Sequence, residues 1–112
     1  MEQSISEHDN VRVITLSGRF DSPAAPLFDA WFTEHDRPQD RYYLLDLAAV
    51  PYITSAGLRS LLKIMKLLEG RNGGLALCNV SVAVQDLFKM AGFVSFLKIY
   101  EGRAAALESL AG

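Results

Sequence analysis

The chain has few of the residues on which covalent and metal chemistry depend. Among its 112 residues are one cysteine, Cys78, and two histidines, His8 and His35. A single cysteine cannot form a disulfide within the chain, so the sequence is typical of a reducing compartment. One cysteine and two scattered histidines make no plausible zinc site. Neither histidine is placed by the sequence to serve a serine nucleophile as its base.

Basic excess and long apolar runs are also missing. Eleven lysines and arginines stand against thirteen acidic residues, for a formal net charge of −2. This balance argues against a nucleic-acid partner, which favours a basic surface. No apolar run approaches the ~20 residues of a membrane-spanning helix, and the first ten residues do not resemble a signal peptide. We therefore expect a cytoplasmic protein that does not insert into membranes.

The glycine motifs of nucleotide-binding enzymes are absent as well. The sequence has neither GxGxxG nor a P-loop, and Gly70–Gly74 precedes a predicted strand where such motifs precede a helix. The segment Thr-Ser-Ala-Gly at 54–57 is not the Gly-x-Ser-x-Gly elbow of hydrolases. We expect no cofactor, no metal and no catalytic activity.

What the chain does contain is the composition of a globular α/β protein. Half of the residues are apolar and 21% are charged, and the length suits a single domain over 1–112. Strand patterns occur at 3–8, 11–16, 42–50, 74–80 and 96–100. Helix patterns occur at 24–36, 55–70, 82–92 and 104–112. The order predicts a mixed, mainly parallel sheet of four to five strands with about four helices and an antiparallel hairpin at one edge.

The helices carry apolar stripes that we expect to face the core. The predicted core residues are Leu27, Phe28, Trp31, Phe32, Leu58, Leu61, Leu62, Met65, Leu68, Phe88 and Met90, with Cys78 as a buried small residue. Arg59, Lys63 and Lys66 lie on the opposite side of their helix, either as a solvated face or as a contact for an acidic partner.

Three polar loops should meet at the carboxyl ends of the parallel strands, where ligands and partners collect. They are residues 18–22, 54–57 and 79–81, and each leads into a predicted helix. Helix starts suit an anion, because their N–H groups are unpaired and partly positive. The simpler interpretation is that Asp21, Ser55 and Ser81 only cap these helices.

Three separated segments resemble one family. They are GRFDSPAAPLFDAW at 18–31, LLDLAAVPYITSAGLRSLL at 44–62 and GGLALCNVSVAVQDLFKMAGF at 73–93. In order and spacing they resemble the STAS domain of the anti-sigma factor antagonists, over essentially the whole chain.

The resemblance implies a partner-switching regulator. In that family a serine kinase that doubles as anti-sigma factor phosphorylates the serine to which Ser55 corresponds, and Gly57 and Asp21 match the neighbouring positions. The family often has aspartate where this chain has Thr54, so Thr54 is the alternative phosphorylation site. The partner surface implied is Asp21, Ser22, Thr54, Ser55, Ala56, Gly57, Arg59 and Lys63.

The resemblance also implies a serine phosphatase as a further partner, and a monomer or weak dimer. The alternative is a STAS scaffold that no kinase modifies, or an accessory subunit of a transporter or lipid-trafficking complex. The serine with its small neighbours favours the phosphorylated antagonist.

Overall fold

Strands and helices alternate along the chain, as predicted. The computed structural model describes residues 1–93 and 95–111. The strands are β1 Glu2–His8, β2 Val11–Ser17, β3 Tyr42–Ala49, β4 Gly74–Cys78 and β5 Lys98–Tyr100. The helices are α1 Ala24–His35, α2 Ser55–Glu69, α3 Val82–Met90 and α4 Arg103–Ala111. The predicted end of the last helix at Gly112 lies outside the described residues.

The strands form one sheet in the order β1-β2-β3-β4-β5. β1 and β2 are antiparallel and joined by a tight turn in which Asp9 has a φ of 55°. β2, β3, β4 and β5 are parallel to one another. The predicted mixed sheet with its edge hairpin is confirmed.

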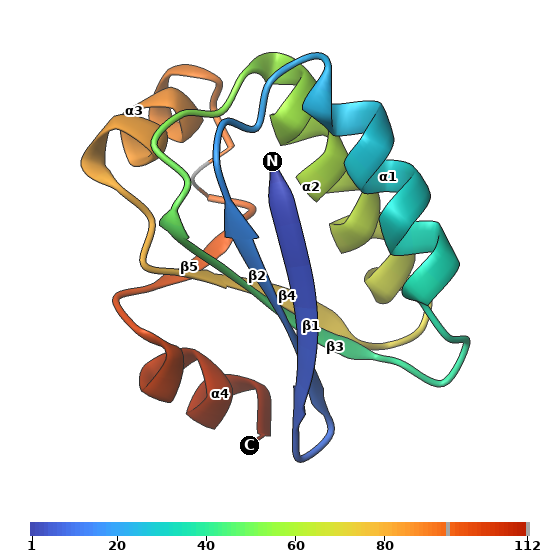
Figure 1. The fold of residues 1–112 in the computed structure, drawn as a ribbon. Coiled ribbons are helices and arrows are strands. Elements are labelled where there is room, and N and C mark those ends of the chain that lie inside the picture. Colours follow the sequence, from blue (N-terminus) through green and yellow to red (C-terminus); the bar gives the residue numbers. More distant parts are fainter. Residues whose placement is uncertain (94, 112) are drawn as a thin grey trace.

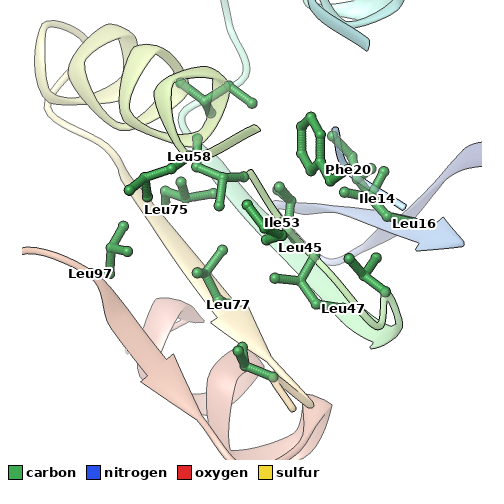
Figure 2. Packing of buried hydrophobic residues seen from close by; sticks show 14 of the residues in the cluster. Ile14, Leu16, Phe20, Leu45, Leu47, Ile53, Leu58, Leu75, Leu77 and Leu97 are labelled. Carbon is green, nitrogen blue, oxygen red and sulfur yellow. The ribbon is translucent and has the colours of Figure 1, made fainter. Parts of the chain in front are cut away.

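Helices cover both faces of the sheet. α1 and α2 lie side by side over one face, and α4 lies below the other (Figure 1). The larger core joins Ile14 and Leu16 of β2 to the buried residues of α1, α2 and α3, and Figure 2 shows its sheet side chains packing under α2. The smaller core joins Val11 and Val13, on the other face of β2, to Ala106 of α4. This alternation is the period-2 pattern of a strand covered on both sides.

Two of the predicted core residues are exposed. Leu27 is 71% exposed and Met90 is 86% exposed. Phe28 and Phe32 are four residues apart and therefore lie on the same, buried face of α1. Leu27 precedes Phe28 by one residue and points away from that face. In α3 the buried residues are Val84 and Phe88, and Met90 lies about 200° around the helix from Phe88. The other predicted core side chains are buried or partly buried against the core, and Cys78 is fully buried.

A network of charged groups fixes the end of the sheet that lies opposite the helix starts. The Asp40 carboxylate accepts a hydrogen bond from Arg12 Nη1 at 2.7 Å and bonds from Arg37. Burial raises the pKa of Asp40, but the hydrogen bonds from Arg37 and Arg12 outweigh it, so the pKa lies below its usual value. Arg71 in turn donates to Asp36 at 2.6 Å. The network joins the loop after α1 to the loop after α2.

Two classes of feature have no example in the part of the chain that the structure describes. None of the described helices combines the length and apolar character that crossing a membrane requires. The described histidine, cysteine and acidic side chains form no group of three that could hold a metal ion.

Candidate functional site

Backbone hydrogen bonds join the loop after β2 to the loop after β3. Phe20 N donates to Tyr52 O at 2.9 Å, and Thr54 N donates to Phe20 O at 3.0 Å. Phe20 and Ile53 thereby form an isolated parallel bridge beyond the ends of the strands. The pairing of β2 with β3 thus continues up to the start of α2, and it fixes the loop that carries Asp21 beside the loop that carries Ser55.

Gly57 allows the first turn of α2 to press against this bridge. A Cβ atom at position 57 would lie 2.6 Å from Phe20 O and 2.9 Å from the Phe20 ring, which is itself fully buried. Real Cβ atoms do not approach backbone oxygens so closely, so only glycine fits here without movement. Because a backbone atom is one of the two contacts, the fit constrains where the helix begins.

Ser55 is the first residue of α2, and its side chain is exposed. The residue in the N-cap position is Thr54, with an extended backbone and no side-chain capping hydrogen bond. The Thr54 hydroxyl is half-buried, at 3.5 Å from Phe20 O. The expectation that Ser55 is an N-cap is therefore wrong by one residue, because the first-turn position belongs to Ser55 and the cap position to Thr54.

Asp21 makes a capping contact with α1, as the simpler interpretation predicted, although Pro23 is the residue directly before the helix. Its Oδ1 accepts from Ala24 N at 3.1 Å, and its carbonyl accepts from Ala25 N at 3.0 Å. The neighbouring Ser22 is exposed. The carboxylate is thus held at one helix start, and the bridge at Phe20 holds that start beside the beginning of α2.

The third predicted loop, at 79–81, is held by a carboxylate on the face of the sheet that α4 covers. Asn79, with a φ of 56°, donates through Nδ2 to Asp46 Oδ1 at 3.2 Å, and Arg103 of α4 donates to Asp46 Oδ2 at 2.7 Å. Burial raises the pKa of Asp46, but the bonds from Arg103 and other donors more than offset this and leave the pKa lowered. Ser81 then caps α3 by accepting from Val84 N at 3.2 Å, as predicted.

The two basic residues predicted for the partner surface differ in their surroundings. Arg59 is exposed one turn after Ser55 and makes no ion pair among the described residues. Lys63 lies a further turn along α2 and pairs with Asp29 of α1 at 3.1 Å. Ala56 and Gly57 lie in the first turn beside Ser55. The structure therefore gathers the predicted residues around one corner of the domain, which consists of the loop at 18–22, the loop at 51–54 and the first turn of α2. Lys63 lies at the margin of this corner.

An apolar groove beside this corner was not predicted. It has a volume of about 260 Å³ and runs between the loop at 51–53 and α3, with Tyr52 and Met90 among its lining residues. Tyr52 is 48% exposed, and Arg19 lies over its ring at 5.4 Å from the centroid. Clustered exposed apolar side chains mark interaction surfaces. Met90 reaches the groove because it does not share the buried Val84–Phe88 face of its helix, and which face is buried is known only from the structure.

The chain is similar to known proteins in sequence and in fold. A protein of Bordetella bronchiseptica with the provisional name anti-sigma factor antagonist BtrV is 31% identical over 106 residues, which cover 95% of this chain and 91% of that protein. The crystal structure of an anti-sigma factor antagonist from Mycobacterium paratuberculosis has a TM-score of 0.89 at 22% identity, over 99% of this chain and 94% of that one. The structure of the Bacillus cell fate determinant SpoIIAA in its phosphorylated form has a TM-score of 0.72 at 18% identity, over 96% and 98%.

The match to a family description spans nearly the whole chain. The sequence pattern of the STAS domain matches residues 2–106, from the first strand into the last helix. The matched range contains the loops at 18–22, 54–57 and 79–81. This chain belongs to the STAS domain family.

Proposed function

We propose that the protein is an anti-sigma factor antagonist whose binding to its partner is controlled by phosphorylation of Ser55. The observation that carries the proposal is the placement of the Ser55 hydroxyl. It is exposed, it lies at the start of a fifteen-residue helix, and it belongs to a corner held by backbone bonds. A kinase can reach such a hydroxyl without unfolding the corner.

The helix start suits the phosphorylated state. Phosphorylation adds about −1.5 to −2 charges at neutral pH. The first turn of α2 has no acidic residue, so the added charge meets the positive end of the helix without a like-charged neighbour in that turn. The modified domain therefore keeps its fold, and the change is confined to its surface.

That surface is the one a partner would contact. It comprises Asp21, Ser22, Thr54, Ser55, Ala56, Gly57, Arg59 and Lys63, together with the apolar groove between residues 51–53 and α3. A phosphate buried at such a contact must lose its hydration without gaining a matched donor, which weakens binding. The unmodified protein would bind the anti-sigma factor, and the phosphorylated one would release it.

The partners follow from this scheme. The anti-sigma factor, acting also as serine kinase, would bind the unmodified corner, and a serine phosphatase would restore it. The protein itself would act by binding and not by catalysis. The relatives named as anti-sigma factor antagonists support this proposal, as does a structural neighbour that is phosphorylated.

Between the two hydroxyls at the corner, accessibility favours Ser55. The Ser55 side chain is exposed, whereas Thr54 is half-buried and its hydroxyl faces Phe20 O at 3.5 Å. To reach a kinase, Thr54 would have to leave this position at the cap of α2. We therefore assign the modification to Ser55 and keep Thr54 as the residue that the experiment must distinguish.

The test is to map phosphate after incubating the protein with ATP and an active serine kinase that binds it. Mass spectrometry should place the phosphate on Ser55. Thr54→Val should leave incorporation intact, and Ser55→Ala should abolish it. Phosphate on Thr54 alone would move the switch by one residue. If the bound, active kinase modifies neither position, the protein is a scaffold or an accessory subunit, and the proposal is wrong.

A further inference from the structure

The strand β1 forms one edge of the sheet, and its outer side has no neighbouring strand in the part of the chain that the structure describes. Figure 1 shows it in dark blue, in front of the other strands. Within residues 1–93 and 95–111, no helix has more than a marginal contact with it. β5, at the opposite edge, is only three residues long. β1 is therefore the edge that can pair with a further strand.

The outward backbone groups of β1 belong to alternate residues. A hydrogen-bonded turn of two residues joins β1 to β2, so His8 and Val11 form a hydrogen-bonded pair. Such pairs alternate along an antiparallel ladder, and the even-numbered residues of β1 therefore direct their N–H and C=O groups toward β2. The groups of Gln3, Ile5 and Glu7 point outward and have no hydrogen bond among the described residues.

β1 lacks several features with which proteins protect an exposed edge. Those features include proline, lysine, a bulge and a very short strand. β1 has seven residues, Glu2–His8, with neither proline nor lysine, and its register with β2 runs without a shift. Its outer N–H and C=O groups are thus arranged to pair with another strand.

A second copy of the chain offers a matching strand. Two identical edges related by a two-fold axis pair antiparallel, and their hydrogen-bonded pairs must join residues whose groups point outward. The register that overlaps all of Glu2–His8 is centred on Ile5 and meets this condition. It places Ile5 opposite Ile5 of the second copy, and Gln3 opposite Glu7 of the second copy. The charge of Glu7 is matched by Arg37 of its own chain.

The even-numbered side chains are also complementary in this register. Ser4 lies opposite Ser6 of the second copy, and Glu2 lies opposite His8, whose imidazole has an N–H donor for the carboxylate. Apolar and hydrogen-bonding pairs stabilise antiparallel strands, and no pair in this register places like charges opposite one another. A shift by two residues in either direction separates Glu2 from His8 and leaves part of each strand unpaired. The pattern of β1 therefore favours a second copy over an unrelated strand.

We propose that β1 is a dimerisation edge, through which two copies of the chain pair antiparallel with Ile5 opposite Ile5. Gln3, Ile5 and Glu7 of each copy exchange backbone hydrogen bonds with the other, and the two five-stranded sheets become continuous. The contact is confined to one strand edge, so the dimer is weak compared with one that buries a large interface. The proposal does not depend on the function proposed for the corner at Ser55.

Disulfide trapping tests this register. Ser4→Cys and Ser6→Cys each replace an exposed serine, so both variants should keep the fold. In the proposed dimer, position 4 lies opposite position 6 of the other copy, with about 4.5 Å between α-carbons. Positions 4 and 4, or 6 and 6, are diagonal neighbours about 7–8 Å apart, which is too far for a disulfide. Cys78 is fully buried and takes no part.

The experiment mixes isotope-labelled Ser4→Cys with unlabelled Ser6→Cys in a glutathione redox buffer, and mass spectrometry identifies each product. The disulfide between the two variants should exceed each like-with-like disulfide at least about tenfold. Ala83→Cys, which is exposed on α3, is the matched control. Mixed with Ser4→Cys, it should give only the products of random collision.

Gln3→Pro tests the backbone bonds without an added cysteine. Proline is tolerated in an edge strand where the missing N–H faces outward, so the thermal midpoint should change little. The dissociation constant of the dimer, measured by sedimentation equilibrium over a concentration series, should rise at least about tenfold, because both copies lose a donor and the ring obstructs the approaching strand. Gln3→Ala keeps the N–H and should associate like the wild type.

Three results would overturn the proposal. They are disulfides in statistical proportions, a predominance of like-with-like disulfides, and self-association of Gln3→Pro equal to that of the wild type. A wild-type chain that stays monomeric, with no disulfide between the two cysteine variants, would leave the edge to a strand of a different protein and would also rule out the dimer. The trapping experiment decides the matter even if Gln3→Pro does not fold.

Discussion

At the scale of single residues, the corner depends on a position where only one residue type fits. That residue is Gly57, since a Cβ atom there would meet both the carbonyl oxygen and the buried ring of Phe20. The loop bearing Asp21 and the helix bearing Ser55 are held together through that contact and the hydrogen bond from Thr54 N to Phe20 O. The position of the exposed hydroxyl is thus set by a glycine two residues later.

Gly57→Ala should lower the free energy of unfolding by about 1–3 kcal/mol, because the new methyl group meets Phe20 O at 2.6 Å. Without such a contact, alanine stabilises a helix interior by about 1 kcal/mol relative to glycine. A loss of stability in the variant would therefore indicate the contact with Phe20. Gly70→Ala is the matched control at the other end of α2, where the nearest atom to a Cβ is 3.4 Å away. Urea unfolding of both variants checks this. A Gly57→Ala protein as stable as the wild type would mean that the contact does not constrain the corner.

At the scale of elements, α4 is attached to the sheet through an apolar contact, to which the partly buried Leu107 and Leu110 also contribute, and through polar contacts that include an ion pair of Arg103. Among the described side chains of α4, only Ala106 is fully buried, in the smaller core. Arg103, at the first position of the helix, pairs with Asp46 at 2.7 Å and donates to Thr15 Oγ1 at 2.7 Å. Because Asp46 also holds Asn79, the attachment of α4 and the start of the third loop share one carboxylate.

Arg103→Ala should therefore destabilise the protein by about 1–3 kcal/mol, since it leaves the buried carboxylate of Asp46 with fewer donors. Amide hydrogen exchange should increase in α4 and in the loop at 79–81, and much less in α1. Arg59→Ala, which removes an exposed arginine without an ion pair among the described residues, should change stability by less than about 0.5 kcal/mol. If exchange in the loop stays at the wild-type level, Asp46 does not couple α4 to that loop.

At the scale of the whole molecule, acid should weaken the fold through two buried carboxylates at opposite ends of the sheet. Both Asp40 and Asp46 have folded-state pKa values below their usual value. A lowered folded pKa contributes stability that is complete above the unfolded value of about 3.9 and is lost as the pH falls through the folded pKa. Urea unfolding should therefore show constant stability above about pH 5 and a decline below about pH 4.

Asp40→Asn should make this acid dependence shallower, because one of the two titrating groups is gone. The variant should also be less stable at neutral pH, where the charge-assisted bonds from Arg12 and Arg37 are lost. Asp9→Asn, in the exposed hairpin turn, serves as the control and should keep the wild-type profile. An Asp40→Asn profile parallel to that of the wild type would show that Asp40 does not carry the acid sensitivity.

The order of the elements and the type of sheet could be predicted from the sequence, because strand and helix periodicity and the turn residues agree locally. The exposure of Leu27 and Met90 could not, since periodicity shows which residues are apolar but not which face is covered. The capping assignment at Ser55 was wrong by one residue for a related reason. Where α2 begins is set by the bridge between Phe20 and Ile53, a contact between residues 33 positions apart.

The most direct test of the central claim is the affinity of the anti-sigma partner for the protein before and after phosphorylation of Ser55, measured by calorimetry at one ionic strength. We predict that phosphorylation weakens binding at least about a hundredfold, while the thermal midpoint of the isolated domain changes little, because the helix start accommodates the charge. Equal affinity of the two forms, with phosphate confirmed on Ser55, would contradict the account. Weaker binding accompanied by unfolding of the domain would also contradict it, because the proposed switch acts at the surface.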